Sequence, residues 1–206
     1  MKKTFVLAMA LLLTISLLSA CGDGGGASDN GSASNNDTGT SGLVNGKVDL
    51  LNRNSYYLII DGHKYGLKTT VQDIINDGYT IKYELDKEVK PNTFLDLHVY
   101  KNGEWYFSMH AVNRTDNIIP LAKCTVRELE VQDEWNTTTT FIGGLHIGSS
   151  KEDVIAVFGN DNEVQTDTFY VYYSREQQKD PDLLGVFYFN FNESGKVRGV
   201  RFTVMN

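Results

Sequence analysis

Residues 144–159 read GLHIGSSKEDVIAVFG, and they carry the clearest helix signal in this chain. Ser150 stands where an N-cap is expected, and Asp153 follows three residues later, which is the spacing of a capping box. Gly159 is suited to end the helix. The apolar residues of the run fall on one stripe of a helix: Val154, Val157 and Phe158. The run therefore predicts a short helix whose one apolar face packs against the strands that follow, on the side that bears Phe187, Phe189 and Phe191.

A similar run lies earlier in the chain, at residues 66–78, GLKTTVQDIINDG. Thr70 and Asp73 occupy the same capping positions, and Gly78 ends the run. In both places a hairpin of long strands is expected to follow. We predict that the chain contains a tandem duplication of a helix-plus-strands unit. The alternative is that two such pieces occur in one α+β domain by chance.

Strand patterns fill most of the remaining sequence between these helices. Asp61-Gly62 and Asn102-Gly103 each separate two apolar runs, which is a strong hairpin signal. Gly199 interrupts the last strand and is a candidate bulge. The expected strands cover residues 56–60, 63–67, 95–100, 105–112, 118–131, 169–173, 186–192 and 197–204. Together these patterns predict an α+β fold, an antiparallel sheet with short helices on one face.

The start of the chain is typical of a bacterial lipoprotein signal. Lys2 and Lys3 precede an apolar segment, and Leu18-Ser19-Ala20-Cys21 closes it. This ending resembles the lipobox, and the resemblance implies cleavage before Cys21 and a diacylglyceryl, palmitate-type anchor on its thiol. One alternative is an ordinary secretory signal with a chance cysteine. Another is an uncleaved membrane helix, but the apolar run is shorter than the roughly 18–20 residues needed to span a bilayer.

The predicted organisation has four parts. Residues 1–20 are the signal peptide, and residues 21–42 form a tether of small and polar residues that offers nothing to a core. Residues 43–135 and 136–206 are the two α–β units. A lipid, a tether and a folded domain place the protein on the extracytoplasmic face of the cell membrane, and the tether suits a Gram-positive cell at least as well as a Gram-negative one.

Charge and cysteine content argue against nucleic-acid binding and against an internal disulfide. Loss of Lys2 and Lys3 with the signal peptide takes the formal net charge from −7 to −9, which is unsuited to nucleic acid. The chain has two cysteines. Because lipidation consumes Cys21, Cys124 has no partner for a disulfide. We expect Cys124 to be a small buried apolar residue in a strand.

The second helix run carries a resemblance to known proteins. Residues 144–159 resemble the opening of small envelope lipoproteins of the outer-membrane-assembly type and are similar to the repeats of β-lactamase inhibitory proteins. The chain as a whole resembles a group of Gram-positive lipoproteins with Gly-Leu-x-Thr-Thr-Val-x-Asp-Ile, here residues 66–74. It departs from the first pattern after Gly159, where Asn160 replaces the usual proline. These resemblances imply tandem α–β units and binding to proteins rather than catalysis, and no contact residue carries over.

Searches for catalytic and metal-binding motifs give no candidate. The four histidines are scattered, and only His98 and His110 fall on strands that are expected to pair. We therefore predict no enzyme activity, no cofactor and no metal site. An envelope enzyme or a small-ligand-binding lipoprotein, with a site assembled only by the fold, is the alternative.

Five tyrosines on predicted strands form the candidate binding face: Tyr100, Tyr106, Tyr170, Tyr172 and Tyr188. Tyrosine is enriched at protein interfaces because it supplies contact area at low entropic cost. The alternative is that strand propensity alone explains its frequency. The sequence thus predicts a lipid-anchored, extracytoplasmic module that binds a protein whose identity it does not reveal.

Overall fold

The computed structural model describes residues 42–135, 138–160, 163–173 and 184–205. These residues belong to one compact unit. The predicted signal peptide, Cys21 and nearly all of the predicted tether lie outside the described residues. Within the described ranges, no helix has the length and apolar character required to cross a bilayer.

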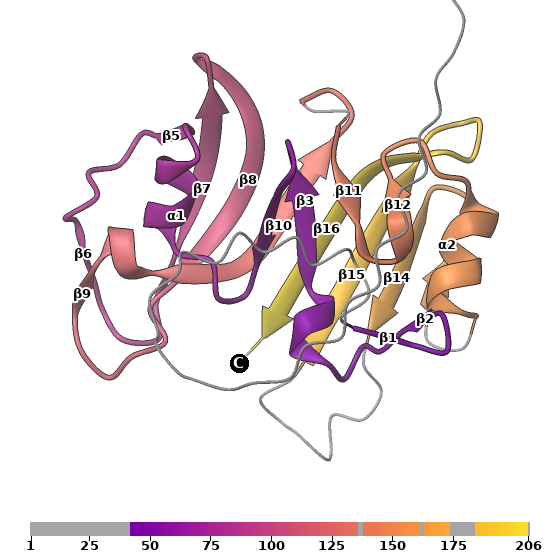
Figure 1. Cartoon of the computed structure of the whole chain (residues 1–206), viewed down its shortest axis with the longest axis horizontal. Helices are drawn as coiled ribbons and strands as arrows, with labels where there is room; N and C mark the ends of the chain where they lie inside the picture. Colours follow the sequence, from indigo (N-terminus) through magenta and orange to yellow (C-terminus); the bar gives the residue numbers. More distant parts are fainter. Residues whose placement is uncertain (1–41, 136–137, 161–162, 174–183, 206) are drawn as a thin grey trace, which may run out of the picture. The chain divides into compact units, whose positions relative to one another are not determined.

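Most of the described chain is antiparallel β-sheet (Figure 1). The main sheet has eight strands, and every neighbouring pair in it is antiparallel. Its strands, in sheet order, are β13 (Glu163–Gln165), β14 (Phe169–Tyr173), β15 (Leu184–Phe191), β16 (Val197–Met205), β10 (Thr125–Gln132), β8 (Glu104–Val112), β7 (Phe94–Lys101) and β5 (Thr80–Ile81). The first half of the chain supplies one end of this sheet and the second half the other. They meet where β10 pairs with β16, so the two predicted units share one continuous sheet.

A second, smaller sheet lies over the first and was not predicted from the sequence. Its order is β12 (Leu145–His146), β11 (Thr140–Phe141), β3 (Tyr57–Ile60) and β4 (His63–Gly66). Two further strand pairs are β1 (Leu43–Val44) with β2 (Lys47–Val48), and β6 (Glu88–Val89) with β9 (Ile119–Pro120). Strands of two residues carry no periodic signal, which explains why the sequence did not predict them.

Both predicted helices are present with their predicted caps. In α1 (Val71–Asn76) the hydroxyl of Thr70 accepts from the N–H of Asp73 at 3.1 Å, and the Asp73 carboxylate accepts from the N–H of Thr70 at 2.8 Å. In α2 (Lys151–Phe158) Ser150 and Asp153 make the same pair of bonds at 3.2 and 2.9 Å. Each capping box satisfies N–H groups that the first turn leaves free.

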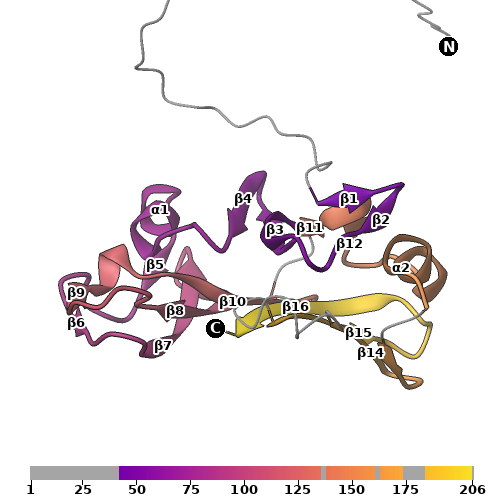
Figure 2. The same ribbon diagram turned by 90° about the horizontal axis from the view of Figure 1, so that it is seen from below.

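Both helices and the small sheet lie on one side of the main sheet (Figure 2). The core fills the space between these layers, and Phe187, Phe189 and Val154 are fully buried in it. The ring of Phe158 lies 5.1 Å from that of Phe187 and 5.0 Å from that of Phe189. The prediction that this helix packs on the phenylalanine face of β15 is confirmed. Val157 is only partly buried and packs beside Gly143.

Three local predictions need correction. The expected strand over 118–131 is interrupted by a 3-10 helix, Leu121–Lys123, between β9 and β10. Cys124 follows this turn instead of lying in a strand, although it is fully buried as predicted. The register shift between β15 and β16 lies one residue before Gly199. Asn190 pairs with Gly199, but the next residue of β15, Phe191, pairs with Val197.

Burial of Cys124 gives a testable consequence. Burial raises the pKa of its thiol to about 11, and the thiolate is the reactive form. We expect a thiol reagent to leave the native domain unmodified and to react at the rate of unfolding as denaturant is added. Melting of residues 43–206 should be unchanged by reductant. Rapid labelling in native buffer, or a melting temperature that falls in reductant, would contradict this environment.

Candidate protein-binding surface

One face of the main sheet carries no described element over it (Figure 2). This surface, opposite the helices, is called the uncovered face below. The described residues include nine exposed large hydrophobic side chains, and strand alternation places four of them here, Phe94, Val164, Phe169 and Met205, and the register shift that pairs Tyr100 with Trp105 turns Trp105 to the same face. These five side chains are spread over β7, β8, β13, β14 and β16, and they make this face the candidate interaction surface.

Backbone register arranges the side chains of the uncovered face in rows across the strands. One row consists of His98, Ser108, Glu130, Arg201, Tyr188, Val171 and Val164. The next row consists of Asp96, His110, Glu128, Thr203, Val186 and Tyr173. Polar and charged residues come mainly from the strands of the first half of the chain, and apolar residues come mainly from those of the second half.

Arginine and tyrosine meet near the middle of this face. The guanidinium of Arg201 lies 4.2 Å from the centre of the Tyr188 ring. Its Nε is buried and has no hydrogen-bond partner among the described residues. Stacking on a ring holds the guanidinium flat and leaves its other N–H groups available. Arginine and tyrosine are the residue types that dominate binding energy in protein interfaces.

Two tryptophans form a second feature of the uncovered face. The rings of Trp105 and Trp135 stack with centres 4.2 Å apart. The ring of His98 meets Trp105 edge-on at 4.3 Å. The indole N–H of Trp105 donates to the carbonyl of Phe107 at 3.2 Å, which fixes the ring while 38% of the residue surface stays exposed.

The structure divides the five predicted tyrosines. Tyr188 lies on the uncovered face, and Tyr100 faces the same way because it pairs with Trp105. Tyr106 turns to the helix side, where its hydroxyl donates to Asp61 at 2.8 Å. Tyr170 and Tyr172 are buried, so their assignment to an exposed binding face was wrong.

The error on β14 has a physical cause. The sequence of Phe169 to Tyr173, FYVYY, is apolar or aromatic at every position. The pattern therefore does not show which residues of the strand face the core and which face outward. Tyr172 instead lies 4.9 Å from the ring of Phe158 in the core. A shift of one residue in strand phase moves every side chain to the other face.

The densest polar cluster lies on the helix side, around Asp61 at the turn between β3 and β4. Its carboxylate accepts from Lys101 at 2.6 Å, Tyr79 at 2.8 Å, Tyr106 at 2.8 Å and Thr138 at 2.9 Å. Burial alone would raise the pKa of Asp61, but these hydrogen bonds outweigh it and lower the pKa from 3.8 to about 2. The cluster joins the small sheet to the hairpin of β7 and β8, and we interpret it as structural. The sequence predicted only the turn at Asp61.

The histidines do not converge. His63 lies 3.2 Å from Asp77, and His110 lies 3.6 Å from Asp96 and 3.7 Å from Glu128. His98 and His110 share the uncovered face but stand in different rows. Among the described residues, no group of three His, Cys, Asp or Glu side chains is arranged to hold a metal ion.

The closest arrangement to a nucleophile and base is His146 with Ser149. Their Nδ1 and Oγ atoms are 2.6 Å apart, but Ser149 is only 4% exposed. The Ser149 hydroxyl also accepts from the N–H of His146 at 3.0 Å, just as Thr69 accepts from the N–H of Gly66 at 3.0 Å before α1. The same bond in both halves of the chain indicates a turn that leads into a helix.

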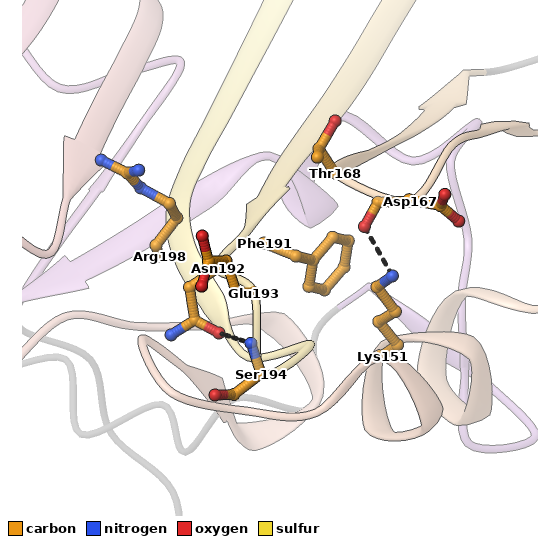
Figure 3. Close-up of a pocket in the computed structure, with 8 residues that line it drawn as sticks. All are labelled: Lys151, Asp167, Thr168, Phe191, Asn192, Glu193, Ser194 and Arg198. Atoms are coloured by element: carbon orange, nitrogen blue, oxygen red, sulfur yellow. Dashed lines mark hydrogen bonds between the residues drawn. The ribbon is translucent and has the colours of Figure 1, made fainter.

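An open hollow of about 910 Å³ lies beside the turn that joins β15 and β16 (Figure 3). Lys151 closes one side and donates to the carbonyl of Asp167 at 2.7 Å, with the Phe191 ring beside it. Arg198 points away from that ring in Figure 3 and binds Glu134 at 2.7 Å. These cations are bound within the protein and do not converge on the hollow, so it lacks the geometry of a small-molecule site.

Comparison with known protein families, with curated protein sequences and with solved structures finds no match to this chain. The resemblances drawn from residues 66–74 and 144–159 therefore stay predictions.

Proposed function

We propose that this protein is a lipid-anchored module that binds another protein on the extracytoplasmic face of a bacterial cell membrane, through the uncovered face of its main sheet. The observation that carries the proposal is the concentration of exposed aromatic and apolar residues on that face. Eight strands about 4.8 Å apart give a surface about 34 Å across. A surface of that width is large enough for a standard interface of roughly 800 Å² per partner.

The attachment point of the tether supports the same assignment. The first described strand, β1, starts at Leu43, directly after the predicted tether. Its hairpin partner β2 lies against α2 on the helix side, where Lys47 donates to the carbonyl of Ala156 at 2.8 Å. A tether of 22 residues has a mean reach of about 25 Å. A chain anchored at Cys21 would therefore keep the uncovered face free for a partner.

A duplicated unit explains how such a broad face arises. Each half of the chain contributes a small-sheet hairpin, a capped helix and four consecutive main-sheet strands. In the first half the N–H of Val126 donates to the carbonyl of Thr69, and in the second half the N–H of Val197 donates to that of Ser149. These matching bonds tie each helix start to the last strand of its half. We infer that a single four-stranded unit was doubled, with its last strands joined at the centre.

Lipid attachment is tested at Cys21. Cells grown with labelled palmitate should label the wild-type protein, because the thiol of Cys21 is the predicted acceptor. Cys21→Ala should lose both the label and membrane association, because the variant lacks the thiol that carries the predicted lipid. Cys124→Ala is the matched control and should keep its label. A labelled, membrane-bound Cys21→Ala variant would show that the anchor lies elsewhere.

The binding function is tested by affinity capture of the intact lipoprotein from its own envelope. We expect a specific protein to be retained by the wild type and lost when Arg201 and Tyr188 are both changed to alanine. The matched control changes Lys87 and Tyr83, an exposed cation–aromatic pair outside the main sheet with the Lys87 Nζ 4.6 Å from the Tyr83 ring centre. Equal retention by both double variants would contradict the assignment of this surface.

A further inference from the structure

We propose that the tryptophan corner of the uncovered face, formed by His98, Trp105 and Trp135, binds a lysine- or arginine-bearing segment of the protein partner. This inference rests on the proposed function and names the kind of partner segment that the uncovered face would bind. It is carried by ring geometry together with the distribution of charge around the rings.

The corner presents a rigid aromatic platform. Trp105 is held by its stack on Trp135, by the edge of His98 and by its hydrogen bond to the backbone of Phe107. Because these contacts hold the ring in place, little freedom is lost when a ligand binds. Tryptophan is the best aromatic partner for a cation, through the negative potential over its ring face.

Carboxylates stand next to this platform. Glu130 lies opposite Ser108, the next residue of β8 that points to the uncovered face after Trp105. Asp96 and Glu128 follow in the neighbouring row, and the Asp96 side chain is 66% exposed. A cation over the indoles would therefore have carboxylates in the two adjacent rows of the same face.

The positive charges of the same face are held against other rings. Arg127 lies over Phe94 at 4.8 Å and Arg201 over Tyr188 at 4.2 Å. Lys82, the nearest of them to the corner, lies at 4.7 Å over Tyr100, the register partner of Trp105. The whole chain has a formal net charge of −7. Charge complementarity therefore favours a basic segment over an acidic one. It also disfavours a second copy of this chain, which would bring the same negative charge.

The chain supplies its own reporter for this corner. It has two tryptophans, Trp105 and Trp135, and they are stacked on each other. Selectively excited tryptophan fluorescence thus reports on this corner alone. Titration of the full chain with a ten-residue lysine peptide should give a saturable fluorescence change that weakens as salt is added. A ten-residue glutamate peptide and a neutral oligosaccharide should give none.

Four variants test the chemistry. Glu130→Gln should weaken lysine-peptide binding about tenfold, since it removes one charge and keeps the side-chain shape. Glu152→Gln, on α2 at the helix side, should bind as the wild type does. Trp105→Phe should bind more tightly than Trp105→Ala, because it keeps an aromatic face. Circular dichroism should show all four folded.

The outcomes separate this inference from the proposed function. If the lysine peptide leaves fluorescence unchanged, or binds Glu130→Gln as it binds the wild type, the inference is overturned. If the envelope partner is still captured through Arg201 and Tyr188, the proposed function survives that failure. A saturable response to the oligosaccharide, or fluorescence that changes with protein concentration alone, would assign the corner to a glycan or to self-association and would also overturn it.

Discussion

Phe158→Ala is expected to lower the free energy of unfolding by about 3–5 kcal/mol. The Phe158 side chain is 9% exposed, and its ring contacts those of Phe187, Phe189 and Tyr172 at 4.9 to 5.1 Å. Alanine would leave a cavity between α2 and the sheet. The loss would be a large share of the roughly 5–15 kcal/mol that stabilises a domain, and urea denaturation of residues 43–206 measures it.

Phe169→Ala is the matched control, because it makes the same chemical change on the uncovered face. Phe169 is 36% exposed, so its loss should cost less than about 1 kcal/mol. Tyr172→Ala belongs with Phe158→Ala, since Tyr172 is fully buried. Equal losses from Phe158→Ala and Phe169→Ala would contradict the assignment of the two faces of the sheet.

Asp61→Asn should destabilise the domain by roughly 2–4 kcal/mol at neutral pH, because four donors lose a charged acceptor. Asparagine tolerates the positive φ of 52° that Asp61 adopts in its turn, so the backbone should keep its form. The variant thus removes the charge of the side chain without changing the backbone of the turn.

The effect of Asp61 should depend on pH. Its pKa is lowered from 3.8 to about 2 in the folded state. Its contribution to stability is therefore fully present above the unfolded pKa and is lost as pH falls through the folded pKa. The stability difference between wild type and Asp61→Asn should narrow between pH 4 and pH 2. A difference that stays constant down to pH 2 would show that Asp61 is not held as an ion.

Local chemistry made part of the fold predictable. Thr70 and Ser150 start the helices where predicted because a hydroxyl with an aspartate three residues later satisfies the first turn. Asp61-Gly62 and Asn102-Gly103 form the predicted hairpin turns because all four residues adopt positive φ.

Contacts between distant segments made the rest unpredictable. The small sheet depends on β3 pairing with β11, about 80 residues later in the chain. The sequence predicted the β3 hairpin, but β11 has only two residues and shows no pattern. The Asp61 cluster gathers donors from three other segments. Trp105 and Trp135 meet only because of the register between β8 and β10. The candidate surface therefore became visible only once the strand phases were known.

The most direct test of the central claim is site-specific cross-linking in living cells. A photoreactive amino acid at Ser108, on the uncovered face, should give a discrete adduct with one envelope protein. The same amino acid at Glu152, on the helix side, should give none. The stability of both variants has to match the wild type. An adduct from Glu152 and none from Ser108 would contradict the claim that the uncovered face of the sheet binds the partner.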